Sequence, residues 1–193
     1  MKLRSLVLAA CAMLIVIPGI ASAEHSFSAN VALTTDYVWR GISQTDEDPA
    51  IQGGFDWEHS NGFSAGVWAS NVDFNSDASM ELDIYGGYSK EFNGVSLSVG
   101  FIHYGYPSES DLNFWEVNAG IGYGPFSAMV SYTDEFGEGA EEAIYYELGA
   151  DFDLPFGGLA LGLHAGYYDI DSSDGESYTD WKIALSKEVY GLG

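Results

Sequence analysis

Apolar and polar side chains alternate with a period of two along most of the chain after residue 25. Residues 144–154 illustrate the pattern. The even-numbered positions are apolar, namely Ile144, Tyr146, Leu148, Ala150, Phe152 and Leu154. The odd-numbered positions are mostly polar or small, namely Tyr145, Glu147, Gly149, Asp151 and Asp153. Successive side chains of a β-strand point to opposite faces, so the pattern predicts a strand with one apolar and one polar face.

Ten segments follow this pattern and predict ten antiparallel strands, at residues 26–41, 50–59, 63–74, 79–90, 95–104, 112–123, 126–133, 144–154, 159–168 and 178–189. Most are longer than the roughly five or six residues of a usual globular strand. They match the roughly 9–11 residues with which a tilted strand crosses a bilayer. The lengths therefore predict an all-β fold, an antiparallel up-and-down transmembrane β-barrel.

The connections between these segments alternate in length. Tight turns are predicted at Asn61-Gly62, Asn93-Gly94, Gly124-Pro125 and residues 155–158, and Asn-Gly pairs suit turns that need positive φ. Longer polar loops lie between them, at residues 42–49, 75–78, 105–111, 134–143 and 169–177. Short turns on one side and long loops on the other are typical of bacterial outer-membrane barrels. With the amino terminus in the periplasm, the long loops face the cell exterior.

A water-soluble β-protein would show the same alternation but would bury its apolar face. The polar face of this chain carries many glycines, serines and carboxylates, so it suits a wet or narrow lumen better than a dry core. Seven aromatic residues near strand ends are expected to form girdles at the membrane interfaces. They are Tyr37, Trp39, Phe55, Trp57, Tyr123, Phe126 and Tyr167. We therefore prefer the membrane barrel.

Residues 1–23 have the three parts of a secretory signal peptide. Lys2 and Arg4 form a basic start, residues 6–17 form an apolar run, and Ala21-Ser22-Ala23 offers a cleavage site. The run is shorter than the roughly 20 residues that a spanning helix needs. We expect cleavage after Ala23, export to the outer membrane, and a barrel formed by residues 24–193.

The chain is strongly acidic, with 29 Asp and Glu against 6 Lys and Arg. This balance argues against nucleic acid as a partner, because phosphates are bound by Lys and Arg. The five predicted loops contain no base and hold about half of all the acids, so the charge is concentrated on the outer side. The expected partners are outer-membrane lipid, lipopolysaccharide and small polar or cationic solutes.

The last residues, 188–193, resemble another tight turn, whereas outer-membrane barrels usually finish in a strand with a terminal aromatic residue. Two alternatives follow. Either the barrel closes with ten strands and an unusual tail, or a last hairpin is missing and the complete protein has twelve strands. We prefer the second alternative.

Several stretches resemble the proteobacterial TorF-type porin family. They are residues 36–45, 49–57, 61–63, 66–74 and 81–88, with sequences such as DYVWRGISQT and GVWASNVDF. The resemblance is most specific between Asp36 and Tyr88 and looser afterwards. It implies an outer-membrane porin-like barrel and does not supply a substrate.

Strand parity and direction place several charged side chains in the outer half of the predicted lumen. The acids are Glu81, Asp83, Glu116 and Glu147; the bases are Arg40, at the outer end of the first strand, and Lys182, in the tenth. Opposed acids and bases in a lumen would create a transverse field and a constriction. The alternative is that they pair and plug a narrow barrel, as in many small barrels. Ten strands favour plugging, and twelve favour conduction.

These features predict a porin-like channel for passive diffusion of small polar solutes, lined by the six charged residues named above. Carboxylates in loops and lumen would enrich cations at the mouth, so we expect cation preference. The alternative is a non-conducting structural or adhesive barrel. An enzyme is a distant third, because a catalytic His needs Ser or Asp beside it and His103, at the rim, shares the lipid-facing parity of Val99 and Phe101. No catalytic residue and no cofactor is predicted.

Four acids near residues 169–176 are candidate contacts for a divalent cation. They are Asp169, Asp171, Asp174 and Glu176. Such a density of oxygen ligands suits calcium, but Gly175 falls one place late for an EF-hand loop and no flanking helices are predicted. A solvated loop is the preferred interpretation. The four histidines lack metal-ligand spacing along the chain, so no metal site is assigned.

Overall fold

The computed structural model describes residues 13–17, 24–136, 141–171 and 176–188. Its strands are β1 (Met13–Ile17), β2 (His25–Thr34), β3 (Val38–Trp39), β4 (Ile42–Ser43), β5 (Ala50–His59), β6 (Phe63–Asn71), β7 (Met80–Phe92), β8 (Val95–Gly105), β9 (Phe114–Tyr123), β10 (Phe126–Phe136), β11 (Glu141–Asp153), β12 (Leu159–Asp171) and β13 (Tyr178–Lys187). One 3-10 turn, η1, spans Ser110–Leu112. All strands except β3 and β4 form one sheet, in the order β1-β2-β5-β6-β7-β8-β9-β10-β11-β12-β13.

The ten predicted segments are confirmed as the ten strands β2 and β5 to β13, and every ladder of the sheet is antiparallel. The predicted tight turns lie between paired strands, and Gly62, Gly94 and Gly124 have positive φ there. Two predicted loops are shorter than expected. The strand β10 runs on to Phe136 and β12 to Asp171, because their ladders with β11 continue to the pairs Phe136–Glu141 and Asp171–Glu142. We call the two ends of the sheet the turn end and the loop end.

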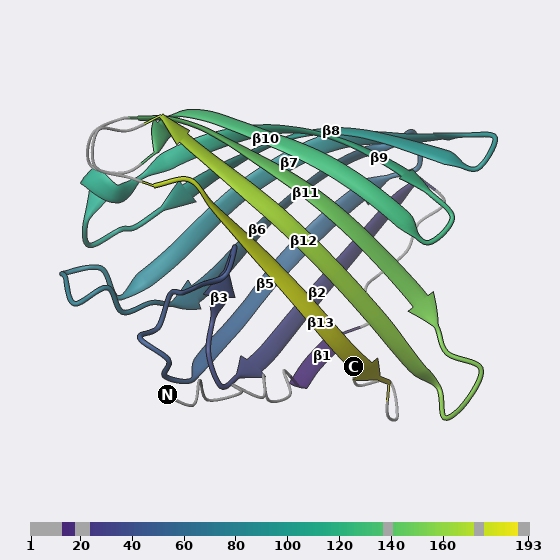
Figure 1. Ribbon diagram of the computed structural model, residues 1–193, viewed down its shortest axis with the longest axis horizontal. Coiled ribbons are helices and arrows are strands. Elements are labelled where there is room, and N and C mark those ends of the chain that lie inside the picture. The colour runs from purple at the N-terminus through teal and green to yellow at the C-terminus, as the bar shows by residue number, and fades with distance from the viewer. Residues whose placement is uncertain (1–12, 18–23, 137–140, 172–175, 189–193) are drawn as a thin grey trace, which may run out of the picture.

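The sheet twists and curls so that its strands surround a central space (Figure 1). Its two edges are β1 and β13, and no ladder joins them in the described part of the chain. Among the described residues, no helix has the length and apolarity needed to cross a membrane.

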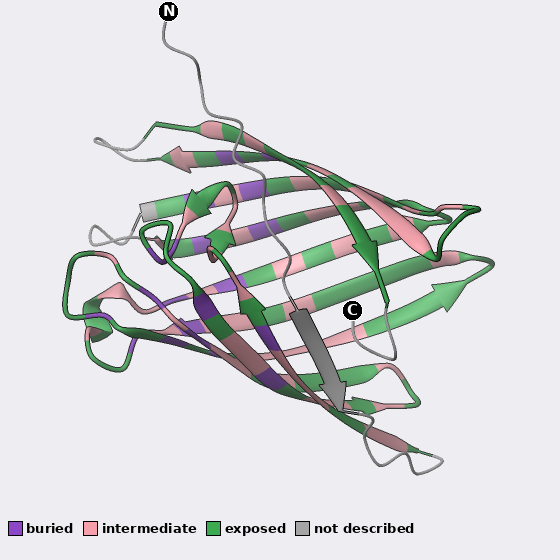
Figure 2. Cartoon of the chain, turned by 90° about the horizontal axis from the view of Figure 1, so that it is seen from below, coloured by how far each residue is buried: buried purple, intermediate pink, exposed green. Residues whose placement is uncertain are grey.

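Apolar side chains cover the outward face of the sheet, and polar or small ones face its interior. Exposed large residues include Phe55 at 69%, Leu148 at 64% and Trp181 at 75%. The buried residues lie instead toward the loop end of the strands (Figure 2). They include the interior carboxylates Glu81, Asp83 and Glu116. The distribution is therefore the reverse of that in a water-soluble protein, whose large apolar groups are mostly inside.

Glycines on the interior face make room for inward-pointing tyrosines. A Cβ on Gly66 would lie 2.5 Å from the ring of Tyr85, and one on Gly166 would overlap the hydroxyl of Tyr145. Glycine therefore supplies space at these two positions. At both places a tyrosine ring of one strand lies over a glycine of a neighbouring strand.

Residues 35–49, which we call the inner loop, leave the sheet and fold into the interior. The predicted strand 26–41 is wrong beyond Thr34. The hydroxyl of Thr34 donates to the carbonyl of Asp36 at 2.8 Å and accepts from its N–H at 3.4 Å, which ends β2 in a local turn. The chain then forms a small hairpin, β3–β4, with Arg40 at φ 46° and Gly41 at φ 82°. Two such residues in succession are the requirement of a two-residue hairpin turn.

The amino-terminal strand β1 lies in the segment that was expected to be a signal peptide. It pairs with β2, from Met13 opposite Leu33 to Ile17 opposite Ala29. Residues 18–23, which contain the expected cleavage site, lie outside the described part of the chain. The edge of β2 that does not face β5 is thus occupied by β1.

Candidate functional site

Arg40 forms a buried ion pair with Glu116 in the interior of the sheet. The turn of the inner loop carries Arg40, and β9 carries Glu116. The guanidinium binds both carboxylate oxygens, with Nη1 2.6 Å from Oε1 and Nη2 2.8 Å from Oε2. The exposed fraction of the two side chains is 9% and 3%. A bidentate contact of this kind is the strongest geometry available to an Arg–carboxylate pair.

Aromatic rings enclose the same guanidinium. The Cζ atom of Arg40 lies 4.3 Å from the ring centre of Trp39, 4.1 Å from that of Tyr145 and 4.9 Å from that of Tyr168. These distances are within the range of cation–π attraction. Burial alone would lower the pKa of Arg40, but the hydrogen bonds and the charge of Glu116 outweigh it and raise this pKa above its ordinary value. The guanidinium is therefore held in its charged form.

The ion pair and its rings form one packed layer across the loop-end half of the interior. Tyr104 stacks on Phe114 at 4.4 Å between ring centres, and its hydroxyl donates to Glu116 Oε2 at 3.2 Å. Trp39 contacts both of these rings. We call this set the Arg40 layer, and it consists of Trp39, Arg40, Tyr104, Phe114, Glu116, Tyr145 and Tyr168. Its wall residues come from β8, β9, β11 and β12.

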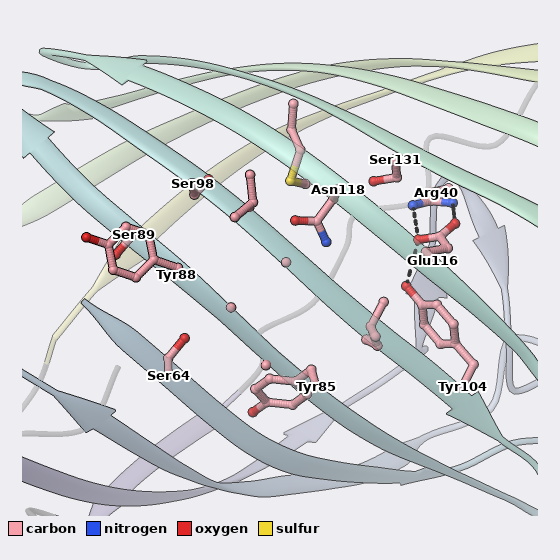
Figure 3. Close-up of a pocket in the computed structure, with 16 residues that line it drawn as sticks. Arg40, Ser64, Tyr85, Tyr88, Ser89, Ser98, Tyr104, Glu116, Asn118 and Ser131 are labelled. Carbon is pink, nitrogen blue, oxygen red and sulfur yellow. Dashed lines mark hydrogen bonds and ion pairs between the residues drawn. The ribbon is translucent and has the colours of Figure 1, made fainter. Parts of the chain in front are cut away.

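Two cavities lie beside the Arg40 layer. The turn-end cavity, about 350 Å³, is lined by Arg40, Glu116 and Tyr104 together with small polar residues such as Ser98 and Asn118 and with Tyr85 and Tyr88 (Figure 3). The loop-end cavity, about 360 Å³, is lined by Trp39 and Phe114 together with Phe74, Tyr106 and Glu109. The layer thus has open space on both of its sides.

A second pair of interior carboxylates lies on β7. Tyr37 Oη donates to Glu81 Oε1 at 2.8 Å, and Tyr106 Oη donates to Glu81 Oε2 at 2.9 Å. Burial, followed by the charge of Glu81, raises the pKa of both tyrosines, so they stay protonated as donors. Asp83 is 5% exposed, and its Oδ1 has no hydrogen-bond partner among the described residues.

A third polar cluster joins β11, β12 and β13. His164 Nε2 lies 2.9 Å from Asp180 Oδ1, and Tyr145 Oη donates to Asp180 Oδ2 at 2.9 Å. Glu147 lies 3.9 Å from His164 Nδ1. The inner loop approaches this cluster closely, since a Cβ on Gly41 would lie 2.7 Å from the Cβ of Asp180. Lys182 is exposed and has no ion pair within the described ranges.

Of the six predicted lumen residues, the structure brings Arg40 and Glu116 into contact and places Glu81 and Asp83 in the same buried half of the interior. Lys182 does not join them. The prediction that Arg40 stands at the outer end of the first strand is wrong. The structure places Arg40 in the turn of the inner loop. This displacement lets a residue near β2 reach across the interior to β9.

The sequence analysis did not predict that aromatic residues of the strands line the interior beside the charged ones. Tyr104, Tyr145 and Tyr168 have the same interior parity as Glu116, Glu147 and His164, so parity could have found them. The expectation that Tyr37 and Trp39 belong to an interfacial girdle is wrong. Both point inward, because the inner loop turns away from the sheet at Thr34. Phe55, Tyr123, Phe126 and Tyr167 are exposed on the outward face.

The acidic loop candidates are not brought together as a metal site in the described part of the chain. Asp169 and Asp171 belong to β12, and Asp169 Oδ1 accepts a hydrogen bond from Ser177 at 3.1 Å. Glu176 is exposed, and Asp174 lies outside the described residues. Asp180, on the neighbouring strand β13, does not complete a metal site with them, because it is bonded to His164.

One described group has ligand atoms close enough for a metal, and the spacing of histidines along the chain did not predict it. The ladder places His25 opposite His59, and their ligand atoms and that of Glu24 lie within 4.8 Å of one another. However, Nδ1 of His25 accepts from Trp57 Nε1 and Nδ1 of His59 accepts from the N–H of Asn61. A metal-bound histidine normally donates from its second nitrogen, so these two bonds oppose metal binding.

Comparisons with known proteins place the chain in a family without assigning an activity. No curated protein and no solved structure matches the chain. Residues 19–192 match the family model described as "Bacterial protein of unknown function (Gcw_chp)". Because the match covers nearly the whole chain, the protein is a member of the bacterial family Gcw_chp.

Proposed function

We propose that this chain is an outer-membrane β-barrel that acts as a porin-like channel for small polar solutes and prefers cations. The observation that carries the proposal is the reversed distribution of its side chains. Large apolar residues such as Phe55 and Trp181 are exposed on the outward face, and carboxylates are buried inside. Water would penalise a continuous apolar face of this size. Lipid would not, and strands of this length cross a bilayer.

Closure of the sheet into a barrel is part of the proposal. Lipid requires it, because an open edge would leave backbone groups without partners. Removal of residues 1–23 would free the edge of β2 that β1 now occupies. The inner loop, which follows β2, already contacts Asp180 on β13. The mature chain would therefore close between β2 and β13, either directly with ten strands or through a further hairpin with twelve.

Cation preference is supported by the charges of the interior and the loops. Arg40 is neutralised by Glu116, and Lys182 is exposed at the sheet edge. Glu81, Asp83 and Glu147 have no basic Lys or Arg partner among the described residues, so the interior has a surplus of carboxyl groups over bases. Such a surplus attracts cations to the passage. The resemblance to TorF-type porins between Asp36 and Tyr88 supports the same role.

A second candidate function is a barrel that does not conduct, with a structural or adhesive role. The observation that favours it is the packing of the Arg40 layer. Tyr145 and Tyr168 are fully buried there, and the layer separates the two cavities. In this arrangement an ion would have to displace the inner loop in order to pass.

The experiment that tests the proposal is conductance of refolded residues 24–193 in a planar bilayer under a salt gradient. Discrete steps with a reversal potential that favours cations are the expected result. Arg40→Ala should raise the conductance, because it removes the side chain that crosses the interior. Lys187→Ala, which removes the same charge from an exposed position at the end of β13, is the matched control. A folded protein that never conducts, in either form, would favour the non-conducting barrel.

A further inference from the structure

The guanidinium of Arg40 is bound much as a ligand is bound by a receptor. The wall of the sheet supplies the acceptor Glu116 and the rings of Tyr145 and Tyr168, while the inner loop supplies the cation. Trp39 is the loop residue that completes the enclosure. The wall therefore supplies the acceptor and two of the three rings that surround this planar cation. We call this part of the wall the cage, which consists of Glu116, Tyr104, Tyr145 and Tyr168.

The cage requires a cation for electrostatic reasons. Glu116 is 3% exposed, and a buried carboxylate without a counter-charge is strongly unfavourable. Glu81 and Asp83, which lie in the same half of the interior, cannot supply that counter-charge. When Arg40 is absent, Glu116 must either take up a proton or pair with another cation, and a cation of similar shape fits the same contacts.

The cage is also within reach of an external ligand. The loop-end cavity of about 360 Å³ adjoins Trp39 and Phe114 and has Glu109 in its wall. The turn-end cavity of about 350 Å³ reaches Arg40 and Glu116 from the other side. The inner loop has bonds of its own, such as Ser43 Oγ to Asp36 Oδ1 at 2.6 Å, and it also contacts the wall through Arg40 and through Tyr37, which donates to Glu81. The cage residues of the wall belong to β8, β9, β11 and β12, so their backbone positions are set by the ladders of the sheet.

We propose that the cage formed by Glu116, Tyr104, Tyr145 and Tyr168 is a binding site for guanidinium-type organic cations, which Arg40 occupies as a tethered substitute. The inference deepens the proposed channel function, on which it rests, by naming the class of solute that the passage recognises. Aromatic faces attract organic cations, and the two oxygens of Glu116 match the paired N–H groups of a guanidinium. A sodium ion is not an organic cation and has no N–H groups to donate.

The test is chemical rescue of Arg40→Ala in the refolded chain. The readout is the temperature at which the folded, detergent-resistant form is lost, measured with guanidinium chloride at millimolar concentration. We expect guanidinium to raise this temperature by about 4 °C in Arg40→Ala. Sodium chloride at the same ionic strength should have no such effect, and neither should urea, which has the same shape without the charge. The wild type should respond less, because Arg40 fills its cage.

The matched control is the double variant Arg40→Ala/Glu116→Gln, which keeps the cavity and removes the carboxylate. It should show no response to guanidinium. An equal response of the single and double variants, or none in Arg40→Ala, would overturn the proposal. If Arg40→Ala does not refold alone, the yield of refolding with and without guanidinium is the readout, and an unchanged yield would count against the cage.

Conductance separates this inference from the channel proposal. Guanidinium rescue in a protein that never conducts would support the cage and refute the channel. Conductance without rescue would support the channel and refute the cage. In a conducting wild type, millimolar guanidinium should change the current at least twofold more than sodium at equal ionic strength, because it competes with Arg40.

Discussion

The two halves of the interior are built on opposite plans. At the loop end, aromatic rings and paired charges fill the space, and Tyr145, Tyr168 and Glu116 are almost fully buried. At the turn end, small polar residues such as Ser98 and Asn118 predominate, and with Tyr85 and Tyr88 they line a cavity of about 350 Å³. The same alternation of polar and apolar positions runs through both halves. The difference lies in the size of the inward side chains and in the inner loop, which enters only one half.

This contrast suggests a division of labour. Packing and buried ion pairs at the loop end supply stability and control access. In the proposed channel, the small residues at the turn end would leave a passage and contribute little to stability. Changes at the loop end should therefore alter the free energy of unfolding, whereas changes at the turn end should alter conductance alone.

The largest effect is expected for Glu116→Leu, which leaves the Arg40 guanidinium buried without its carboxylate. Loss of one partner from a buried ion pair costs about 3–5 kcal/mol of unfolding free energy. Urea unfolding of the refolded protein in lipid vesicles measures the change. Arg40→Met/Glu116→Leu, which removes both charges, should lose clearly less. A single variant within 1 kcal/mol of the wild type would show that the loop end is not the stable half.

A smaller effect is expected for Gly166→Ala at the loop end. The new Cβ would overlap the hydroxyl of Tyr145, which cannot move away because it is bonded to His164 and Asp180. Overpacking of this kind costs about 1–3 kcal/mol. Gly122→Ala is the matched change at the turn end, where the Cβ meets only the rotatable hydroxyl of Ser96. Equal losses in the same urea titration would remove the contrast between the two halves.

The turn-end cavity is tested by Ser98→Lys, which adds a positive charge to its wall. Because the cavity has open space, we expect the unfolding free energy to change by less than about 1 kcal/mol. The reversal potential under a salt gradient should shift toward anions, since a positively charged side chain in the wall repels cations from a narrow passage. Ser98→Ala is the control and should shift neither quantity. An unchanged potential in Ser98→Lys would place the passage elsewhere.

The smallest effect is expected for Lys182→Ala. The side chain is exposed and has no ion pair with any described residue, so the unfolding free energy should stay within about 0.5 kcal/mol of the wild type. Thermal loss of the folded form on gels is a sufficient measurement. A loss above 1 kcal/mol would reveal a contact at the β13 edge, for instance in the closed barrel.

The strands were predictable because their period of two is a local property of the chain. The same periodicity caused the largest error. Residues 36–40 alternate like a strand, and two of them, Val38 and Trp39, do form β3. The local turn at Thr34, made by a side-chain hydroxyl, carries no signal in the alternation. The expected first strand therefore ran past its true end and placed Trp39 and Arg40 at the rim.

By itself, the sequence determined the ten long strands, the tight turns and the face on which Glu81, Asp83 and Glu116 lie. Each of these follows from the spacing of side chains within one strand. Only the tertiary structure decided which residues meet across the interior. Arg40 and Glu116 are 76 positions apart, and their contact depends on the curvature of the sheet and on the inward path of the inner loop. Alternation specifies the direction of a side chain, but long-range packing specifies its partner.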